Sequence, residues 1–392
     1  MTREQQLPYF AHVSFTDPGW KANPQKLLDA ARRWRAPDSV TIERFNIEQF
    51  QKLHGVQGIP TSTSGKAMRD KIISVLTTSE FLTGPKAHSL DPKYGLLTRV
   101  TDAIGEARPI EIVIPSFAGR PHNPAAHRRV APDLGELYAL QLLKNISDTV
   151  AKIYAPGAIF TLLLDGRAYR GFYGYSDQEG MPYVRNLRNQ IDQLGARGQI
   201  DVVEMYDLIS ARSKELSEID SRVRNELKAR WSDSLFPQRS NLIRALRQGT
   251  ETTAISSAFI EIYKAGQYSP TELQGFFRQA EIIVYERAEE TAFEYAVLMT
   301  KLKELDIIGR AFPRAIRGTV HPKPGQYAPR MKNPKTRISP WHGVAILTKS
   351  GEIITEYETL VYQDFECYRA VFIRGDEAPF YYEEIVPDMT AT

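Results

Sequence analysis

The sequence predicts an α/β protein with a Rossmann-like, largely parallel sheet, an inserted helical block and a C-terminal β-rich extension. Two observations carry this prediction. The runs at residues 110–114 and 158–164 are almost wholly apolar, as is typical of strands that are buried on both faces of a sheet. Segments with helical periodicity alternate with such runs, and strand–helix alternation indicates βαβ units with parallel strands.

The N-terminal part, residues 1–105, mixes short amphipathic segments with Pro and Gly. We interpret it as a helical lead-in or cap, with helices at residues 25–34 and 66–76. The remainder, residues 106–392, is interpreted as one α/β domain.

This domain begins with the strand at residues 110–114, which is followed by a loop rich in Pro, His and Arg that reaches residue 131. A helix is expected to begin at Pro132 and Asp133 and to run to Tyr154. Proline suits a first helical turn, and the carboxylates of Asp133 and Glu136 suit the positive end of the helix dipole.

The strand at 158–164 leads into a turn at residues 165–167, then a helix near 183–194 and a third strand at 200–205. Residues 219–305 have a helical pattern that breaks at 266–270, so they are predicted to form the helical insertion. The final part, residues 316–392, returns to strands, which are expected at 316–320, 342–347, 353–356 and 370–373.

Composition excludes several classes of protein. The 392 residues are 42% hydrophobic and carry a net charge of +3, which lacks the basic excess of a nucleic-acid-binding protein. Cys367 is the single cysteine, so neither an intramolecular disulfide nor a multi-cysteine zinc site can form. No apolar run has the length of a signal peptide or membrane span, and we expect a soluble, cytoplasmic protein with no membrane partner.

The loop at residues 115–131 is the first candidate binding site, because it joins a parallel strand to a helix N-terminus, where anions are favoured. Its basic side chains offer donors to a phosphate. On charge alone a solvated loop is the more common role, but its length favours a function. The basic residues are Arg120, His122, His127, Arg128 and Arg129.

Two further groups of residues are candidates. Asp165, followed by Gly166 and Arg167, stands just past an apolar strand, where a carboxylate could shuttle protons or only shape the turn. In the C-terminal part, basic side chains precede an aromatic one, which would suit a phosphate and a planar group, although packing at a strand edge is the more common fate. These residues are Arg317, His321, Lys323 and the Pro340-Trp341-His342-Gly343 tetrapeptide.

Other patterns are excluded. The segment at residues 58–67 resembles a phosphate loop, but its glycines are too far apart and Ala67 replaces the hydroxyl that would bind magnesium. No histidine stands in a His-x-Asp/Glu or His-Glu-x-x-His arrangement, and a Gly-x-Gly-x-x-Gly fingerprint is missing. We therefore expect no metal and no redox cofactor.

The motifs in their order resemble those of the isonitrile (isocyanide) synthase family, which is related to pyoverdine and dityrosine biosynthesis proteins. The resemblance extends over about residues 109–347. It rests on Pro132-Asp-Leu-Gly-Glu136, Pro156-Gly-Ala158, Asp165-Gly-Arg167, Ile316-Arg-Gly-Thr-Val-His-Pro322 and Pro340-Trp-His-Gly343.

The resemblance implies an enzyme of secondary metabolism that turns the amino group of an amino acid, such as tyrosine or tryptophan, into an isonitrile. Ribulose 5-phosphate is the co-substrate, and its ketone carbon becomes the isonitrile carbon through imine formation, proton transfers and carbon–carbon cleavage. Asp165, His321 and His342 are then expected in catalysis. Substrate and phosphate are expected to be bound by Arg120, Asn123, Arg128, Arg129, Asp133, Arg167, Arg317 and Trp341.

One residue departs from the pattern that the resemblance implies. The family's loop carries Lys-Ser-x-Asn, whereas this chain has Arg120-Pro-His-Asn123. Arginine, with a pKa above ~12, is a poor proton shuttle and forms no Schiff base. If the lysine is essential, this member has changed its mechanism or its substrate.

Two alternatives stay open. The chain could perform another amino-acid modification, giving a formyl or imine product, or it could be a non-catalytic protein that binds a ligand or partner on the same scaffold. If the chain is an isonitrile synthase, an iron/2-oxoglutarate oxygenase is expected to act after it in the pathway.

Overall fold

The computed structural model describes residues 38–385 except 57–66, 84–94, 118, 121–128, 169–176, 244–269, 321–326, 337, 359–360 and 362–366. For residues 38, 177–180 and 270–286 only the backbone is described. The helix predicted at residues 25–34 lies outside these ranges.

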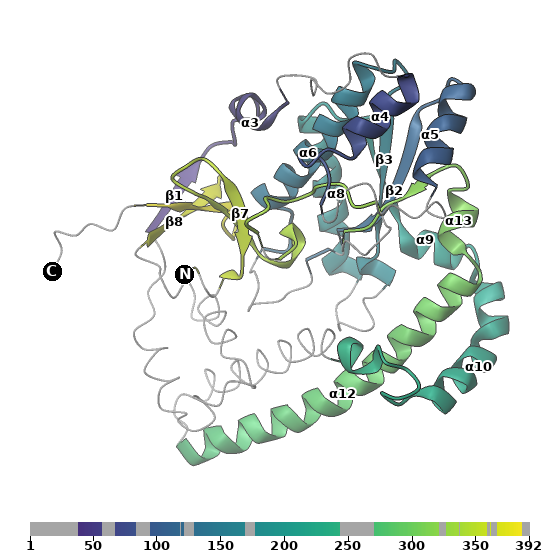
Figure 1. Ribbon diagram of the computed structural model, residues 1–392. Helices are drawn as coiled ribbons and strands as arrows, with labels where there is room; N and C mark the ends of the chain where they lie inside the picture. Colours follow the sequence, from purple (N-terminus) through teal and green to yellow (C-terminus); the bar gives the residue numbers. More distant parts are fainter. Residues whose placement is uncertain are drawn as a thin grey trace.

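Four parallel strands form the central sheet (Figure 1), in the spatial order β4-β3-β2-β5. Their bounds are Ile110–Ser116 for β2, Ala158–Leu164 for β3, Ile200–Glu204 for β4 and Ile316–Arg317 for β5. This is the strand order of a Rossmann half, so the predicted fold class is confirmed. In such sheets, ligands bind outside the carboxyl ends of the strands where the order reverses, which here lies between β2 and β5.

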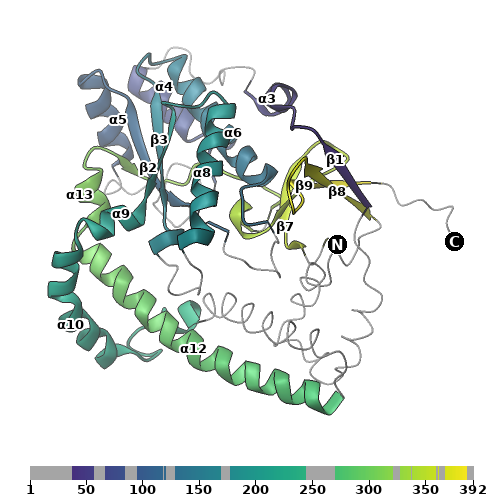
Figure 2. The ribbon, with the colours of Figure 1, turned by 180° about the vertical axis from the view of Figure 1, so that it is seen from behind.

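Helices cover both faces of this sheet (Figures 1 and 2). On one face, Ile112 and Ile114 of β2 share a buried cluster with apolar residues of four helices. These helices are α4 (Met68–Leu76), α5 (Leu96–Gly105), α6 (Leu134–Ala151) and α8 (Asp177–Gln193).

On the other face, Val113 and Leu163 pack against a second set of helices, because successive side chains of a strand point to opposite faces. This set contains α9 (Met205–Ser210), α10 (Ser213–Arg230), α12 (Pro270–Glu304) and α13 (Ile307–Ala311). Val223 and Leu227 of α10 pack against Ala296 and Val297 of α12. The two helices form an arm that extends away from the sheet (Figure 1), and the predicted helical insertion is thus confirmed for the residues described.

A second, five-stranded sheet has the order β1-β8-β9-β6-β7. Its strands are β1 (Asp38–Ile42), β6 (Val344–Leu347), β7 (Ile353–Glu356), β8 (Tyr368–Ile373) and β9 (Tyr381–Glu384). The C-terminal extension is therefore β-rich, as predicted. However, β1 belongs to residues 1–105 and pairs in parallel with β8, and the same N-terminal part supplies α3 (Ile47–His54).

Several element boundaries differ from the predictions. The helix expected to reach Tyr154 ends at Ala151, and the strand expected at 316–320 keeps regular pairing only to Arg317. The strand expected at 342–347 begins at Val344, because Pro340–His342 form a 3-10 turn, labelled η5. Proline fixes its own φ and lacks an N–H for a ladder, so it favours a turn before the strand.

Candidate functional site

The carboxyl ends of three central strands lie at one level. Ser116 of β2 pairs with Leu164 of β3, and Leu164 pairs with Glu204 of β4. The segments that follow Ser116 and Leu164 therefore begin side by side at the edge where open α/β sheets bind ligands. Arg120 and Asp165 are the predicted site residues on these two segments.

Asp165 follows β3 directly and precedes helical residues 166–168. The residue is half-buried, and its Oδ1 is fully buried without a hydrogen-bond partner. Burial raises the pKa of the Asp165 carboxyl to about 7. A carboxyl with this pKa is present in both protonation states at neutral pH, which suits a group that both donates and accepts protons.

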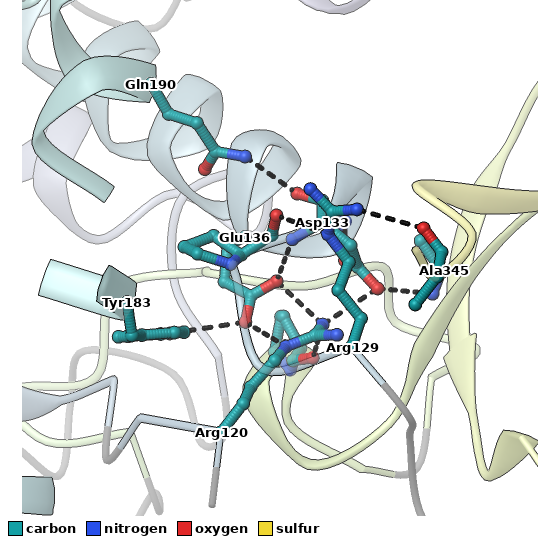
Figure 3. Close-up of polar contacts among 11 residues, drawn as sticks. Arg120, Arg129, Asp133, Glu136, Tyr183, Gln190 and Ala345 are labelled. Atoms are coloured by element: carbon teal, nitrogen blue, oxygen red, sulfur yellow. Dashed lines mark hydrogen bonds and ion pairs between the residues drawn. The ribbon is translucent and has the colours of Figure 1, made fainter. Parts of the chain in front are cut away.

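Arg120 is buried and forms an ion pair with two carboxylates (Figure 3). Its Nε and Nη2 donate to Oε1 and Oε2 of Glu136 at 2.6 and 2.7 Å. Nη2 also lies 2.8 Å from Asp133 Oδ2 and donates to the Pro340 carbonyl at 3.0 Å. Nη1 is buried and has no hydrogen-bond partner. Because two sides of the guanidinium are fixed by the protein, Nη1 is the part of Arg120 that could meet a ligand.

Asp133 and Glu136 form a capping box at the start of α6. The Asp133 side chain accepts from Gly135 N at 2.6 Å, and Glu136 Oε2 accepts from Asp133 N at 2.9 Å. Leu134 N donates to the Phe380 carbonyl. The first amides of α6 are therefore bonded within the protein, and the expectation that this helix terminus receives a phosphate is corrected.

The cluster of Arg120, Asp133 and Glu136 holds two carboxylates and one guanidinium, and two neighbours contact it. Tyr183 of α8 donates to Glu136 Oε1 at 3.2 Å, and Gln190 Nε2 donates to the Asp133 carbonyl at 3.0 Å (Figure 3). Burial, with the nearby Asp133 charge, raises the pKa of Glu136 to about 8, although Arg120 acts against this.

The second sheet docks on the same cluster. Ala345 N of β6 donates to Asp133 Oδ2 at 3.1 Å. Trp341 is buried and packs against Phe117, with the ring centroids 4.7 Å apart. Trp341 thus packs on the residue that follows β2, and its role in binding substrate stays a prediction.

Phe117 has a backbone φ of 54° and is fully buried. Left-handed backbone is strained for a bulky residue and often marks a functional turn. Here it turns the chain from the end of β2 towards Arg120.

Arg167 and Arg317, two other predicted site residues, have protein partners of their own. Arg167 lies over the ring of Tyr206, 4.0 Å from its centroid, and 3.8 Å from Glu204. Arg317 forms an ion pair with Asp306 before α13. Each contacts a neighbouring carboxylate, and the roles of Arg167 and Arg317 in binding substrate or phosphate stay predictions.

Arg129 contacts Asp376 at 2.7 Å and lies over the Phe380 ring. His342, in η5, is exposed, and its catalytic role stays a prediction. Asn123, Arg128 and His321 lie outside the described residues, and their roles stay predictions too.

Sequence reasoning missed Phe117, Tyr183 and the ion-pair role of Glu136. The Asp133-x-x-Glu136 spacing is the sequence signature of a capping box and could have revealed the pairing of these carboxylates. Nothing in the sequence marked Phe117 or Tyr183. Among the described residues, no three His, Cys, Asp or Glu side chains are grouped to hold a metal, and no helix could cross a membrane.

Comparison with known proteins extends these observations. The model of a family described as "Pyoverdine/dityrosine biosynthesis protein" matches residues 100–367, well over half of the chain. The chain is similar to an L-tyrosine isonitrile synthase of Pseudomonas aeruginosa, with 26% identity over 262 residues that cover 66% of this chain and 76% of that protein. An L-tryptophan isonitrile synthase of Fischerella ambigua is 22% identical over 231 residues, covering 58% and 66%.

The fold is similar to the crystal structure of the PvcA protein from Pseudomonas aeruginosa. The TM-score is 0.59 at 22% identity, and the match covers 81% of this chain and all of that one. This likeness shows a shared fold.

Proposed function

The chain belongs to the pyoverdine/dityrosine biosynthesis protein family and is an isonitrile synthase, and we propose that it acts on an amino acid with ribulose 5-phosphate as carbon donor. Its relatives are named as tyrosine and tryptophan enzymes, so an aromatic amino acid is the proposed substrate class.

The proposed chemistry is supported mainly by the raised pKa of Asp165 and by its position at the end of β3. Condensation of an amine with a ketone moves protons from nitrogen to the carbonyl oxygen, which leaves as water when the imine forms. A carboxyl group with a pKa of about 7 can accept and donate these protons in turn. Asp165 stands at the carboxyl end of β3, beside the end of β2, and its partnerless Oδ1 is available for this role.

Arg120 is proposed to bind rather than to transfer protons. Glu136 and Asp133 fix its guanidinium, and the free Nη1 can donate to an anionic group of a substrate. An arginine held in this way cannot form a Schiff base, so imine formation in this protein proceeds without a covalent bond to residue 120.

The test is to incubate the purified protein with single amino acids and ribulose 5-phosphate and to detect isonitrile by mass spectrometry and tetrazine trapping. Donor labelled with ¹³C at C2 should give a labelled isonitrile carbon, whereas donor labelled at C1 should not. Absence of product with every amino acid would contradict the proposal. A formamide, which differs from an isonitrile by one water, would instead indicate the divergent activity.

A further inference from the structure

Tyr183 connects helix α8 to the ion pair of the candidate site. The residue is buried, and its hydroxyl donates to Glu136 Oε1 at 3.2 Å (Figure 3). Burial, with the nearby Glu136 charge, raises the pKa of the Tyr183 hydroxyl well above its ordinary value. The hydroxyl therefore keeps its proton at neutral pH and is the donor in this contact.

The Tyr183 hydroxyl completes the set of donors around the Glu136 carboxylate. Oε1 accepts from Arg120 Nε at 2.6 Å and from Tyr183. Oε2 accepts from Arg120 Nη2 at 2.7 Å and from Asp133 N at 2.9 Å. A carboxylate has about four acceptor positions, so a donor stands at each one and the orientation of the carboxylate is fixed.

The orientation of Glu136 in turn determines that of the Arg120 guanidinium. The guanidinium is planar and rigid, so its Nη1 has only one direction once Nε and Nη2 are paired with the two carboxylate oxygens. Nη1 has no hydrogen-bond partner among the described residues. In the function proposed above, it donates to an anionic group of a substrate. A shift of the Glu136 carboxylate would therefore turn Nη1 away from that group.

Helix α8 is well placed to hold this arrangement, because it contacts the start of α6 at a second point. Gln190 Nε2 donates to the Asp133 carbonyl at 3.0 Å. Residues 183 and 190 are seven positions apart, which places them on one face of α8. The Tyr183 ring also lies beside the chain that follows β2, since a Cβ at Gly119 would be 4.0 Å from its Cδ1. The hydroxyl is thus presented to Glu136 by a ring that is itself packed in place.

We propose that Tyr183 is a positioning residue for the reaction, and this inference rests on the function proposed above. Its hydroxyl acts through Glu136: it fixes the carboxylate and so keeps the Arg120 guanidinium oriented for substrate binding.

The test compares Tyr183→Phe with the wild type, because this variant loses one oxygen and keeps the ring. In the isonitrile assay, kcat should change less than about twofold. The KM for the substrate that Arg120 binds should rise about 5- to 20-fold, because a guanidinium that is out of place loses part of a charge-assisted hydrogen bond. The Kd should rise to the same extent when the full chain is titrated separately with ribulose 5-phosphate, tyrosine and tryptophan.

A second variant tests whether Tyr183 acts through Arg120. Arg120→Lys lacks the planar fork that pairs with Glu136, so adding Tyr183→Phe to it should weaken substrate binding no further. A purely structural role of Tyr183 would make the two effects additive. Circular dichroism and the Tm of each variant report whether the fold is kept.

Tyr154→Phe is the matched control. It also removes a buried hydroxyl, one that donates to the Ala103 and Arg108 carbonyls at 2.8 and 2.9 Å. Tyr154 precedes β3 and so lies at the amino end of the sheet, opposite the candidate site. Its loss should lower the Tm and leave KM and Kd unchanged.

The inference is overturned if Tyr183→Phe has wild-type KM and Kd values, if Tyr154→Phe raises them equally, or if Tyr183→Phe and Arg120→Lys are additive. A wild-type chain that binds these substrates and makes no isonitrile would contradict the proposed function alone, and the Kd values would still decide the role of Tyr183. A wild-type chain that binds none of them overturns both.

Discussion

Arg120 and Glu136 form a buried two-point ion pair, with Nε–Oε1 and Nη2–Oε2 distances of 2.6 and 2.7 Å. The pair joins the segment after β2 to the start of α6. Arg120 Nη2 also donates to the Pro340 carbonyl, which connects η5, the turn before β6, to the same network. The position where the family resemblance implies a lysine is therefore part of the protein's internal structure.

Removal of Arg120 should destabilise the protein strongly. Arg120→Ala leaves two buried carboxylates without a cation, and we expect a loss of about 3–5 kcal/mol in the free energy of unfolding, measured by urea denaturation. Arg120→Lys keeps the charge but lacks the planar guanidinium fork, so its free energy of unfolding should lie between those of the wild type and Arg120→Ala. Arg197→Ala, in an exposed pair with Asp192, is the control and should change little. An Arg120→Ala variant as stable as the wild type would contradict a structural role.

Replacement of Asp165 should separate activity from stability. Asp165→Asn removes the proton-transfer group, so turnover should fall by about 100- to 10,000-fold in the isonitrile assay. The Tm should be unchanged or higher, because a buried carboxyl without a partner on Oδ1 becomes a neutral amide. Asp201→Asn, an exposed residue of β4, is the matched control. Wild-type rates from Asp165→Asn would remove this residue from the mechanism.

Stability should decrease as the pH rises from about 3.8 to 7. The pKa of Asp165 is raised from 3.8 to about 7 in the folded protein, because its carboxyl is buried. Between these two pH values the unfolded chain has lost a proton that the folded protein keeps. The contribution of Asp165 to stability is therefore complete below the unfolded pKa and is lost as the pH rises through the folded pKa. Urea unfolding of the wild type and Asp165→Asn across this range measures the effect. Equal pH slopes in the two proteins would argue against a raised pKa of Asp165.

Two glycines should respond in opposite ways to alanine. A Cβ at Gly343 would lie 2.5 Å from the Glu356 carbonyl oxygen across the β6–β7 pair, so Gly343→Ala should lower the Tm. A Cβ at Gly105, the last residue of α5, would meet no atom within 4 Å. Gly105→Ala should leave stability unchanged or increase it by up to about 1 kcal/mol, since alanine is the better helix former. Calorimetry of both variants measures their Tm values. A lower Tm for Gly105→Ala, with no decrease for Gly343→Ala, would contradict the prediction.

Local patterns were sufficient to predict β2, β3, β4 and α6. A strand buried on both faces is apolar over its whole length, and a helix that starts with Pro132 and Asp133 carries its own capping signals. The position of Asp165 at a strand end could also be predicted from the sequence, because it depends only on where β3 ends. These features depend on neighbours within a few residues, which is the range over which a sequence pattern acts.

Tertiary structure alone decided which segments meet. Strand β1 pairs with β8 from the far end of the chain, and its short, exposed sequence contains no signal for that partner. The arginines could be recognised as cations from the sequence, but whether each one faces a ligand or a carboxylate depends on chain packing. Arg120 meets Glu136 inside the molecule and Arg317 meets Asp306 at its surface. The sequence by itself thus determined the fold class, the family resemblance and the location of Asp165. The ion-pair partners required the folded chain, because a charged side chain pairs with whatever packing brings within a few ångströms.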